Sequence, residues 1–220
     1  MHKAEHIRSR FSSTWSEILH QKIQLECSDE ETRYLTPPLD AIMIQREIAK
    51  FEPAPRHFVD AFACIGGDSL AAMLVHPAAD VWAIQRAKSA AEKERFGRLE
   101  TNLRRFRRTV GRTGRVCWYA SDIGNFLMHF KDDISVLFLD PPWAVGPDPD
   151  VISPAEEIRA FLGNNVFRHL QTRPRYICLK LPHSVEDSIE QWPRSSAAGY
   201  RLVRSIHVRR RYFVYILQRL

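Results

Sequence analysis

The sequence that decides the fold is Ser135-Val-Leu-Phe-Leu-Asp-Pro-Pro-Trp143. Its first half is a short apolar run of the kind that forms a strand buried on both faces. An aspartate, two prolines and a tryptophan follow where that strand ends. Proline fixes the backbone and removes an N–H, so the carbonyl groups here can be aimed at a ligand. With the Asp140 carboxylate they can hold a planar amine, on which Trp143 can stack.

The size and charge of the chain set the broad class. Its 220 residues and 25.6 kDa suffice for one well-filled domain with an extension. No apolar run approaches the roughly 18 to 20 residues that span a bilayer, so we expect no membrane contact. A net charge of +6 and a pI near 9.3 favour an acidic partner, of which nucleic acid is the commonest.

The cysteines indicate the compartment. They show neither metal-ligand spacing nor a disulfide framework, so we expect buried thiols in a reducing compartment and no metal site. The N-terminus lacks the apolar segment of a secretory signal, but the basic stretch Met1 to Arg10 leaves an organellar presequence open. The expected location is intracellular, in the nucleus or cytoplasm, with an organelle as the alternative. The four cysteines are Cys27, Cys64, Cys117 and Cys178.

Helical patterns fill the first quarter of the chain. Apolar residues at helical spacing predict a helix over 6–22. Thr36-Pro37-Pro38 predicts the start of a second helix, with the Thr36 hydroxyl as its N-cap. We therefore expect residues 1–55 to be a helical extension and 56–220 to be the main domain. The first helix either packs on that domain or contacts a partner such as RNA.

From residue 57 the pattern alternates between strand and helix. This alternation predicts an α/β, Rossmann-like domain with a mostly parallel sheet and helices on both faces. A closing hairpin adds one antiparallel strand, for seven in all. The expected strands are 57–62, 80–85, 115–119, 134–139, 175–181, 200–208 and 212–218, and the expected helices are 70–75, 88–108, 123–130, 155–170 and 185–198.

A second motif lies where a cofactor would bind. In such sheets, ligands bind beyond the carboxyl ends of the strands. The first strand ends in Asp60, and Gly66-Gly67 opens the following helix. Glycines there would let the backbone pass close to a ligand.

From about Thr36 onward the chain resembles the trimethylguanosine synthase family. This family methylates the exocyclic N2 amine of 7-methylguanosine RNA caps with S-adenosylmethionine. The resemblance implies a class I methyltransferase fold. Its matching pieces are Thr36-Pro37, Val59-Asp-Ala-Phe62 with Gly66-Gly67, Asn102 (which we expect on a helix surface), Ser121-Asp122, Asp140-Pro-Pro-Trp143 with Gly146-Pro147-Asp148, and Lys180-Leu-Pro182.

The resemblance also implies roles for individual residues. Asp60 would face the amino group of S-adenosylmethionine, and Asp122 would hold the adenine amine. Gln85 stands where the family has a carboxylate for the ribose hydroxyls. The catalytic set is Asp140, Pro141, Pro142 and Trp143, and the cofactor-binding set is Asp60, Phe62, Gly66, Gly67, Gln85 and Asp122.

Three departures from the family pattern favour other readings. Cys64 replaces a glycine, Gln85 replaces an acid, and Ala144-Val145 replaces a glycine pair. An amide makes weaker hydrogen bonds than a carboxylate, by roughly a factor of two. The alternative is therefore a catalytically degenerate, methyltransferase-like RNA-binding or structural subunit of a ribonucleoprotein or other large assembly. A third reading keeps the chemistry but moves it to adenine N6.

Two basic runs are candidate RNA contacts. The first ends the helix at 88–108, which places it at the edge of the sheet opposite the cofactor. The second lies at the turn of the closing hairpin, on the rim of the site. They comprise Arg104, Arg105, Arg107 and Arg108, and Arg209, Arg210 and Arg211.

Overall fold

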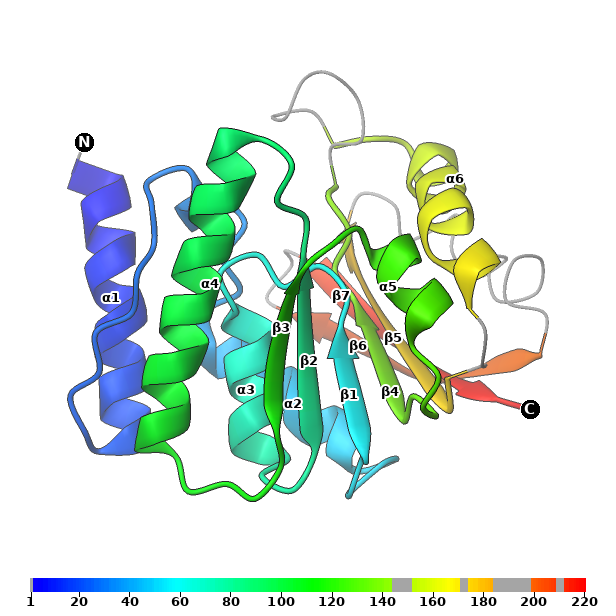
Figure 1. Ribbon diagram of the computed structural model, residues 1–220, viewed down its shortest axis with the longest axis horizontal. Helices are drawn as coiled ribbons and strands as arrows, with labels where there is room; N and C mark the ends of the chain where they lie inside the picture. Colours follow the sequence, from blue (N-terminus) through cyan, green and yellow to red (C-terminus); the bar gives the residue numbers. More distant parts are fainter. Residues whose placement is uncertain (1, 144–151, 171–173, 184–198, 209–211) are drawn as a thin grey trace.

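The computed structural model describes residues 2–143, 152–170, 174–183, 199–208 and 212–220. Within these residues, seven strands form one sheet in the order β3-β2-β1-β4-β5-β7-β6. β7 alone runs opposite to the other six strands, so the predicted sheet is confirmed (Figure 1). The strands are β1 His57–Asp60, β2 Asp80–Gln85, β3 Val116–Ala120, β4 Val136–Leu139, β5 Tyr176–Pro182, β6 Tyr200–Val208 and β7 Tyr212–Arg219.

Helices cover both faces of the sheet. In Figure 1 α1 to α4 lie on one side and α5 and α6 on the other. The helix expected at 185–198 lies outside the described residues. The bounds are α1 His2–Leu19, α2 Pro38–Ala49, α3 Gly67–Val75, α4 Ala90–Thr109, α5 Ile123–His129 and α6 Ala155–Asn165, with short 3-10 turns η1 Glu31–Arg33 and η2 Phe167–His169.

The central strands are buried on both faces because each face packs on helices. Phe58 of β1 and Phe138 of β4 stack at 6.2 Å between ring centroids on the side of α1 to α4. Their neighbours Val59 and Leu137 point to the side of α5 and α6. Strands buried in this way are apolar on both faces, which is the pattern of Val136–Leu139 and of the middle of β1.

The N-terminal segment packs on α4. Trp15 of α1 meets Phe106 edge to face, with centroids 5.0 Å apart. Asn102 of α4 accepts from the Glu26 backbone N–H at 2.6 Å and donates to the carbonyls of Glu26 and Ile65 at 2.9 and 3.0 Å. The expectation that Asn102 lies on the helix surface is therefore wrong. Its amide is fully buried and joins residues 23–28 to the turn after β1.

The second helix begins differently from the prediction. Its N-cap is Pro37, and no side chain caps it. The Thr36 hydroxyl is buried and turns instead toward the carboxyl ends of β1, β4 and β5. Among the described residues, no helix is long and apolar enough to cross a bilayer.

Candidate active site

Asp60 ends β1 in a fully buried position. Its Oδ2 accepts a hydrogen bond from the Ser69 hydroxyl at 2.6 Å. Burial, followed by the charge of nearby Asp68, raises the pKa of Asp60 to about 7. At neutral pH this carboxyl is therefore only partly ionised. A nearby cation would drive off its proton.

Asp140, which follows β4, is bound to a buried lysine. Lys180 of β5 donates to Asp140 Oδ2 at 2.5 Å and to Thr36 Oγ1 at 2.5 Å. The Thr36 hydroxyl in turn donates to Asp68 Oδ2 at 2.7 Å. The Lys180 ammonium lies 3.5 Å from the same Asp68 oxygen and 4.7 Å from the centre of the Tyr212 ring. Side chains from five segments far apart in sequence thus meet at one point.

The charges of this cluster do not balance. One lysine faces the carboxyl groups of Asp60, Asp68 and Asp140. Burial raises the pKa of Asp140 to about 6, although Lys180 acts to lower it. Burial lowers the pKa of Lys180, but the charges of Asp140 and Asp68 outweigh this and raise it above its ordinary value. Asp68 Oδ1 is buried and has no hydrogen-bond partner among the described residues. The cluster therefore carries excess negative charge.

Trp143 lies at the edge of the same cluster. Its ring is partly buried and packs against Tyr212 of β7, with centroids 6.0 Å apart and planes at 54°. Its indole N–H is buried and has no hydrogen-bond partner among the described residues. Pro141 is buried and Pro142 is exposed. Ala144-Val145 and Gly146-Pro147-Asp148 lie outside the described residues.

The glycines of the turn after β1 allow close packing by the protein itself. Gly66 has φ +101°, and a Cβ there would lie 3.1 Å from Leu99 of α4. A Cβ on Gly67 would lie 3.4 Å from the Thr36 carbonyl oxygen. Cys64 has φ +50°, which favours glycine. The departure from the family pattern at Cys64 thus falls on a position where the backbone prefers glycine.

Three other predicted cofactor residues surround this turn. Gln85 accepts from the Cys64 N–H at 2.9 Å and donates to the Arg86 carbonyl at 3.0 Å, so its amide braces the turn. Asp122 forms an exposed ion pair with Lys88 at 2.6 Å. Phe62 packs on Phe161 of α6, with centroids 5.9 Å apart. These contacts place all three at the carboxyl ends of β1 to β3.

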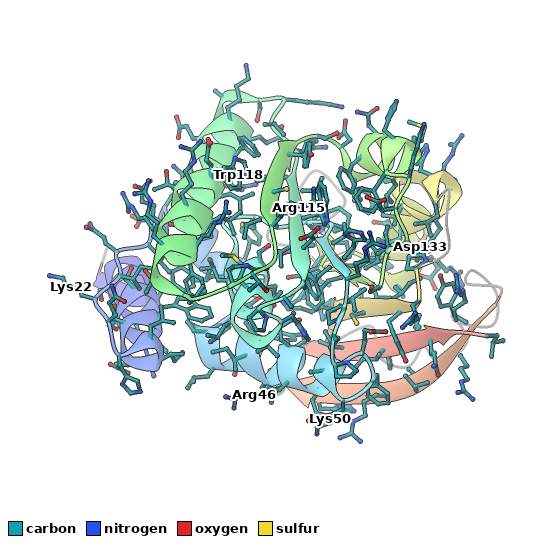
Figure 2. All side chains as sticks on the ribbon, turned by 60° about the horizontal axis from the view of Figure 1, so that its bottom comes forward. Lys22, Arg46, Lys50, Arg115, Trp118 and Asp133 are labelled. Atoms are coloured by element: carbon teal, nitrogen blue, oxygen red, sulfur yellow. The ribbon has the colours of Figure 1, made fainter. Side chains whose placement is uncertain are left out.

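The basic run of α4 lies elsewhere. Because α4 runs against the parallel strands, its last turn lies at the end of the sheet away from Asp140 (Figure 1). Arg104 pairs with Glu100 at 2.6 Å, and its guanidinium lies 5.3 Å from the Trp118 ring centre. Figure 2 labels Trp118 of β3 and Arg115, the residue before that strand. Arg105 is bound to the Gln24 carbonyl and to Glu26, whereas Arg107 and Arg108 are exposed.

The structure therefore brings together some of the predicted site residues but not all of them. It places Asp60, Asp140 and Trp143 in or beside one cluster and keeps the arginines of α4 apart from it. Arg209, Arg210 and Arg211 lie outside the described residues. Local sequence patterns did not predict the contacts made by Thr36, Asp68, Lys180 and Tyr212. Thr36 and Lys180 belonged to the resemblance, but their separation of 144 positions gave no sign that they touch.

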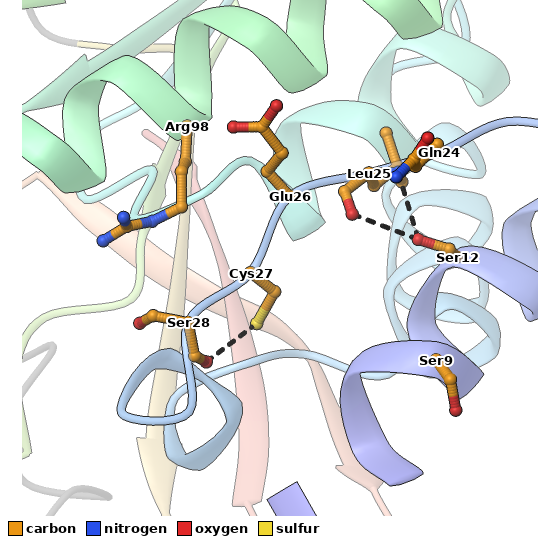
Figure 3. Close-up of a pocket in the computed structure, with 8 residues that line it drawn as sticks. All are labelled: Ser9, Ser12, Gln24, Leu25, Glu26, Cys27, Ser28 and Arg98. Carbon is orange, nitrogen blue, oxygen red and sulfur yellow. Dashed lines mark hydrogen bonds between the residues drawn. The ribbon is translucent and has the colours of Figure 1, made fainter. Parts of the chain in front are cut away.

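An open hollow lies on another part of the surface, between α1, residues 24–28 and α4 (Figure 3). It shares no residue with the Asp140 cluster. Its cation, Arg98, is bound to Glu31. The lining residues are Ser9, Ser12, Gln24, Leu25, Glu26, Cys27, Ser28 and Arg98.

Comparison with known proteins identifies the fold. No family model and no curated protein matches the chain. A methyltransferase from Pyrococcus furiosus matches with a TM-score of 0.62 at 18% identity, covering 97% of each chain. Magnesium protoporphyrin IX methyltransferase (ChlM) from Synechocystis, with bound S-adenosylmethionine, matches with 0.58 at 13%, covering 99% of this chain and 97% of that one. The fold is that of class I S-adenosylmethionine-dependent methyltransferases.

An RNA enzyme also shares this methyltransferase fold. An rRNA methylase from Streptococcus thermophilus matches with a TM-score of 0.50 at 12% identity, covering 84% of this chain and 98% of that one. At such identities the likeness extends to the fold alone.

The Asp140 cluster fits the cofactor of this methyltransferase fold. S-adenosylmethionine carries a sulfonium and an ammonium group, and the cluster has carboxylates in excess. Asp60, whose pKa is raised, and the unpaired Asp68 Oδ1 are the groups that a cation would stabilise. Within the described residues, no group of three or more His, Cys, Asp and Glu side chains could hold a metal ion.

Proposed function

We propose that the protein is an S-adenosylmethionine-dependent RNA methyltransferase acting on an exocyclic base amine, namely the N2 amine of a cap guanosine. The observation that carries the proposal is the cluster of Asp140, Lys180 and Asp68. Pro141-Pro142-Trp143 follows directly after Asp140 in the sequence. Together these residues place an amine acceptor, an aromatic ring and excess negative charge at the carboxyl ends of the strands.

The chain's own residues would hold the two reactants. Bound S-adenosylmethionine supplies a methyl group: the amine lone pair forms the new N–C bond, the pair of the broken C–S bond returns to sulfur, and the amine loses one proton. Asp140 would accept the amine hydrogen bond and take up that proton before releasing it to water. Trp143 would stack on the base, and a positively charged 7-methylguanine adds about 0.5–2 kcal/mol of cation–π attraction. Asp60 would pair with the cofactor's ammonium group.

RNA as the substrate rests on the charge of the chain and on the family resemblance. A net charge of +6 and the exposed Arg107 and Arg108 would attract phosphates at a distance from Asp140, Pro141, Pro142 and Trp143, which together form the proposed clamp on the amine. Guanine N2 rather than adenine N6 follows from the resemblance alone. Action on RNA also fits the expected nuclear or cytoplasmic location, with an organelle as the alternative.

A second candidate function has its own support. Cys64 has a backbone conformation that favours glycine, and the Gln85 amide already braces the turn, so both departures fall on the cofactor half of the site. These features suit a catalytically degenerate subunit that binds RNA within a ribonucleoprotein or other large assembly.

Cofactor binding separates the two functions. In calorimetry, S-adenosylhomocysteine should bind the protein at pH 8. Binding should weaken at pH 5.5, because Asp60, with a pKa of about 7, is then protonated and cannot pair with the ligand's ammonium group. No heat at millimolar ligand at either pH would overturn the enzyme and leave the binding subunit.

Methyl transfer tests the clamp. With a 7-methylguanosine-capped oligonucleotide, Asp140→Ala and Trp143→Ala should each lower kcat/KM by about 100-fold or more, since each removes a group that orients the amine. Asp132→Ala and Trp118→Ala are matched controls away from the cluster, and they should retain activity. Activity retained in Asp140→Ala would exclude the clamp mechanism.

A further inference from the structure

We propose that Lys180 is a positioning residue for Asp140: held by Thr36 and Asp68, it fixes carboxylate Oδ2 and keeps the group ionised, so that Oδ1 is left for the amine. The proposal deepens the proposed function and depends on it for the identity of the amine. The contacts of Lys180 with Asp140, Thr36 and Asp68 do not depend on the proposed function.

The ammonium group of Lys180 is surrounded by groups of the protein itself. It has three N–H donors. Two of them reach Asp140 Oδ2 and Thr36 Oγ1 at 2.5 Å, and the remaining space is filled by Asp68 Oδ2 at 3.5 Å and the Tyr212 ring. The side chain is 2% exposed. Lys180 therefore has no donor for a substrate and acts through Asp140.

The direction of every hydrogen bond in the chain of contacts is fixed. An ammonium group only donates, and an ionised carboxylate only accepts. Thr36 must therefore accept from Lys180 and donate its single proton to Asp68. Asp68 thus orients the Thr36 hydroxyl, and Thr36 helps to point Lys180 at Asp140. Thr36, in the segment before α2, therefore helps to position Lys180 in the site.

Lys180 is the one cation among the described groups that face Asp140. Asp60 approaches from β1, Cys64 from the turn after β1, Asp68 from α3 and Tyr212 from β7. The two other carboxylates make a proton on Asp140 more favourable, whereas Lys180 makes it less favourable. Removing Lys180 should therefore raise the pKa of Asp140, and removing the Asp68 charge should lower it.

The experiment is a carbon-13 NMR titration of aspartate-labelled protein, with the Asp140 signal identified by its absence in Asp140→Asn. Lys180→Gln should raise the Asp140 pKa by at least about one unit, because an opposite charge in contact shifts a pKa by roughly 1 to 3 units. Lys180→Arg keeps the cation and should give a value near that of the wild type. Asp68→Asn keeps the acceptor for Thr36 but removes a negative charge, so it should lower the pKa.

An Asp140 pKa unchanged in Lys180→Gln would overturn the proposal. If Lys180→Gln does not fold, Lys180→Met decides, because it keeps an unbranched side chain without the charge: a raised Asp140 pKa supports the proposal, and an unchanged or lowered one overturns it. The titration contains neither cofactor nor RNA. A protein that binds no S-adenosylhomocysteine can therefore still give either result, which separates this failure from failure of the proposed function.

Discussion

Two buried clusters of charged residues differ in how well they are satisfied. In the first, Arg98 donates to both oxygens of the fully buried Glu31 at 2.8 to 3.1 Å, and the Ser28 N–H adds a further bond at 2.8 Å. Burial raises the pKa of Glu31, but these bonds outweigh it and the pKa falls below its ordinary value. In the second cluster burial prevails, and the pKa values of Asp60 and Asp140 rise to about 7 and about 6.

The difference distinguishes a structural ion pair from a binding site. Glu31 and Arg98 satisfy one another and fasten residues 28–31 to α4, so they stabilise the fold. The cluster around Asp140 has fewer cations than carboxyl groups, and the raised pKa values of Asp60 and Asp140 mean that ionising these two groups costs stability without a ligand. A cationic ligand would restore the balance there, and strongly shifted pKa values of this kind are concentrated at functional sites.

The largest expected effect is on the satisfied cluster. Arg98→Met should lower the free energy of unfolding by about 3 kcal/mol, because it leaves the buried Glu31 charge without its main partner. Urea denaturation at pH 7 measures this. Arg104→Met is the matched control on the same helix: it removes an exposed pair with Glu100 and a contact with the Trp118 ring, and it should change stability by less than about 1 kcal/mol. Equal losses in the two variants would mean that the first cluster is not a structural pair.

Replacing a carboxyl group of the unsatisfied cluster should instead raise the free energy of unfolding. Below about pH 4, Asp60 is protonated in both the folded and the unfolded chain. As the pH rises from 3.8 to about 7, the unfolded chain releases its proton while folded Asp60 holds it, so the free energy of unfolding falls. A shift of about three pKa units corresponds to roughly 4 kcal/mol at pH 8. Asp60→Asn removes this cost but buries an amide N–H that needs a partner, so we expect a net gain of about 2 kcal/mol.

The gain from Asp60→Asn should vanish below pH 4, which denaturation at several pH values can follow. Asp122→Asn, which removes an exposed ion pair with Lys88, is the control and should change stability by less than about 1 kcal/mol. A destabilised Asp60→Asn protein at pH 8 would contradict the contrast between the clusters.

The smallest effect concerns the backbone beside the unsatisfied cluster. Cys64→Gly should raise stability by up to about 1 kcal/mol, because glycine adopts φ +50° without strain. Gly66→Ala should lower it by about 1 to 2 kcal/mol, since its φ is +101° and its Cβ would press on Leu99. Thermal unfolding of the two variants side by side measures both. A loss in Cys64→Gly would mean that thiol packing outweighs the strain.

Local patterns were enough to predict the sheet. The bounds of β2 at Asp80–Gln85 and β6 at Tyr200–Val208 agree with the prediction, and the seven strands pair as expected. Strands buried between two layers of helices are mostly apolar, and runs of neighbouring apolar residues show this directly in the sequence. Asp140-Pro-Pro-Trp143 could be located at the carboxyl end of β4 for the same reason.

The partners of these side chains could not be predicted from local patterns. Thr36 looked like an N-cap and Asn102 like a surface residue, because each fits a local motif or helix surface. Folding brings Thr36 beside Lys180, 144 positions away, and Asn102 beside Glu26, 76 positions away. The sequence by itself thus determined the sheet and the place of the Asp140 motif. Only the tertiary structure decided that Asp140 is bound to Lys180 and that carboxylates outnumber cations around it, because such contacts depend on which distant segments meet.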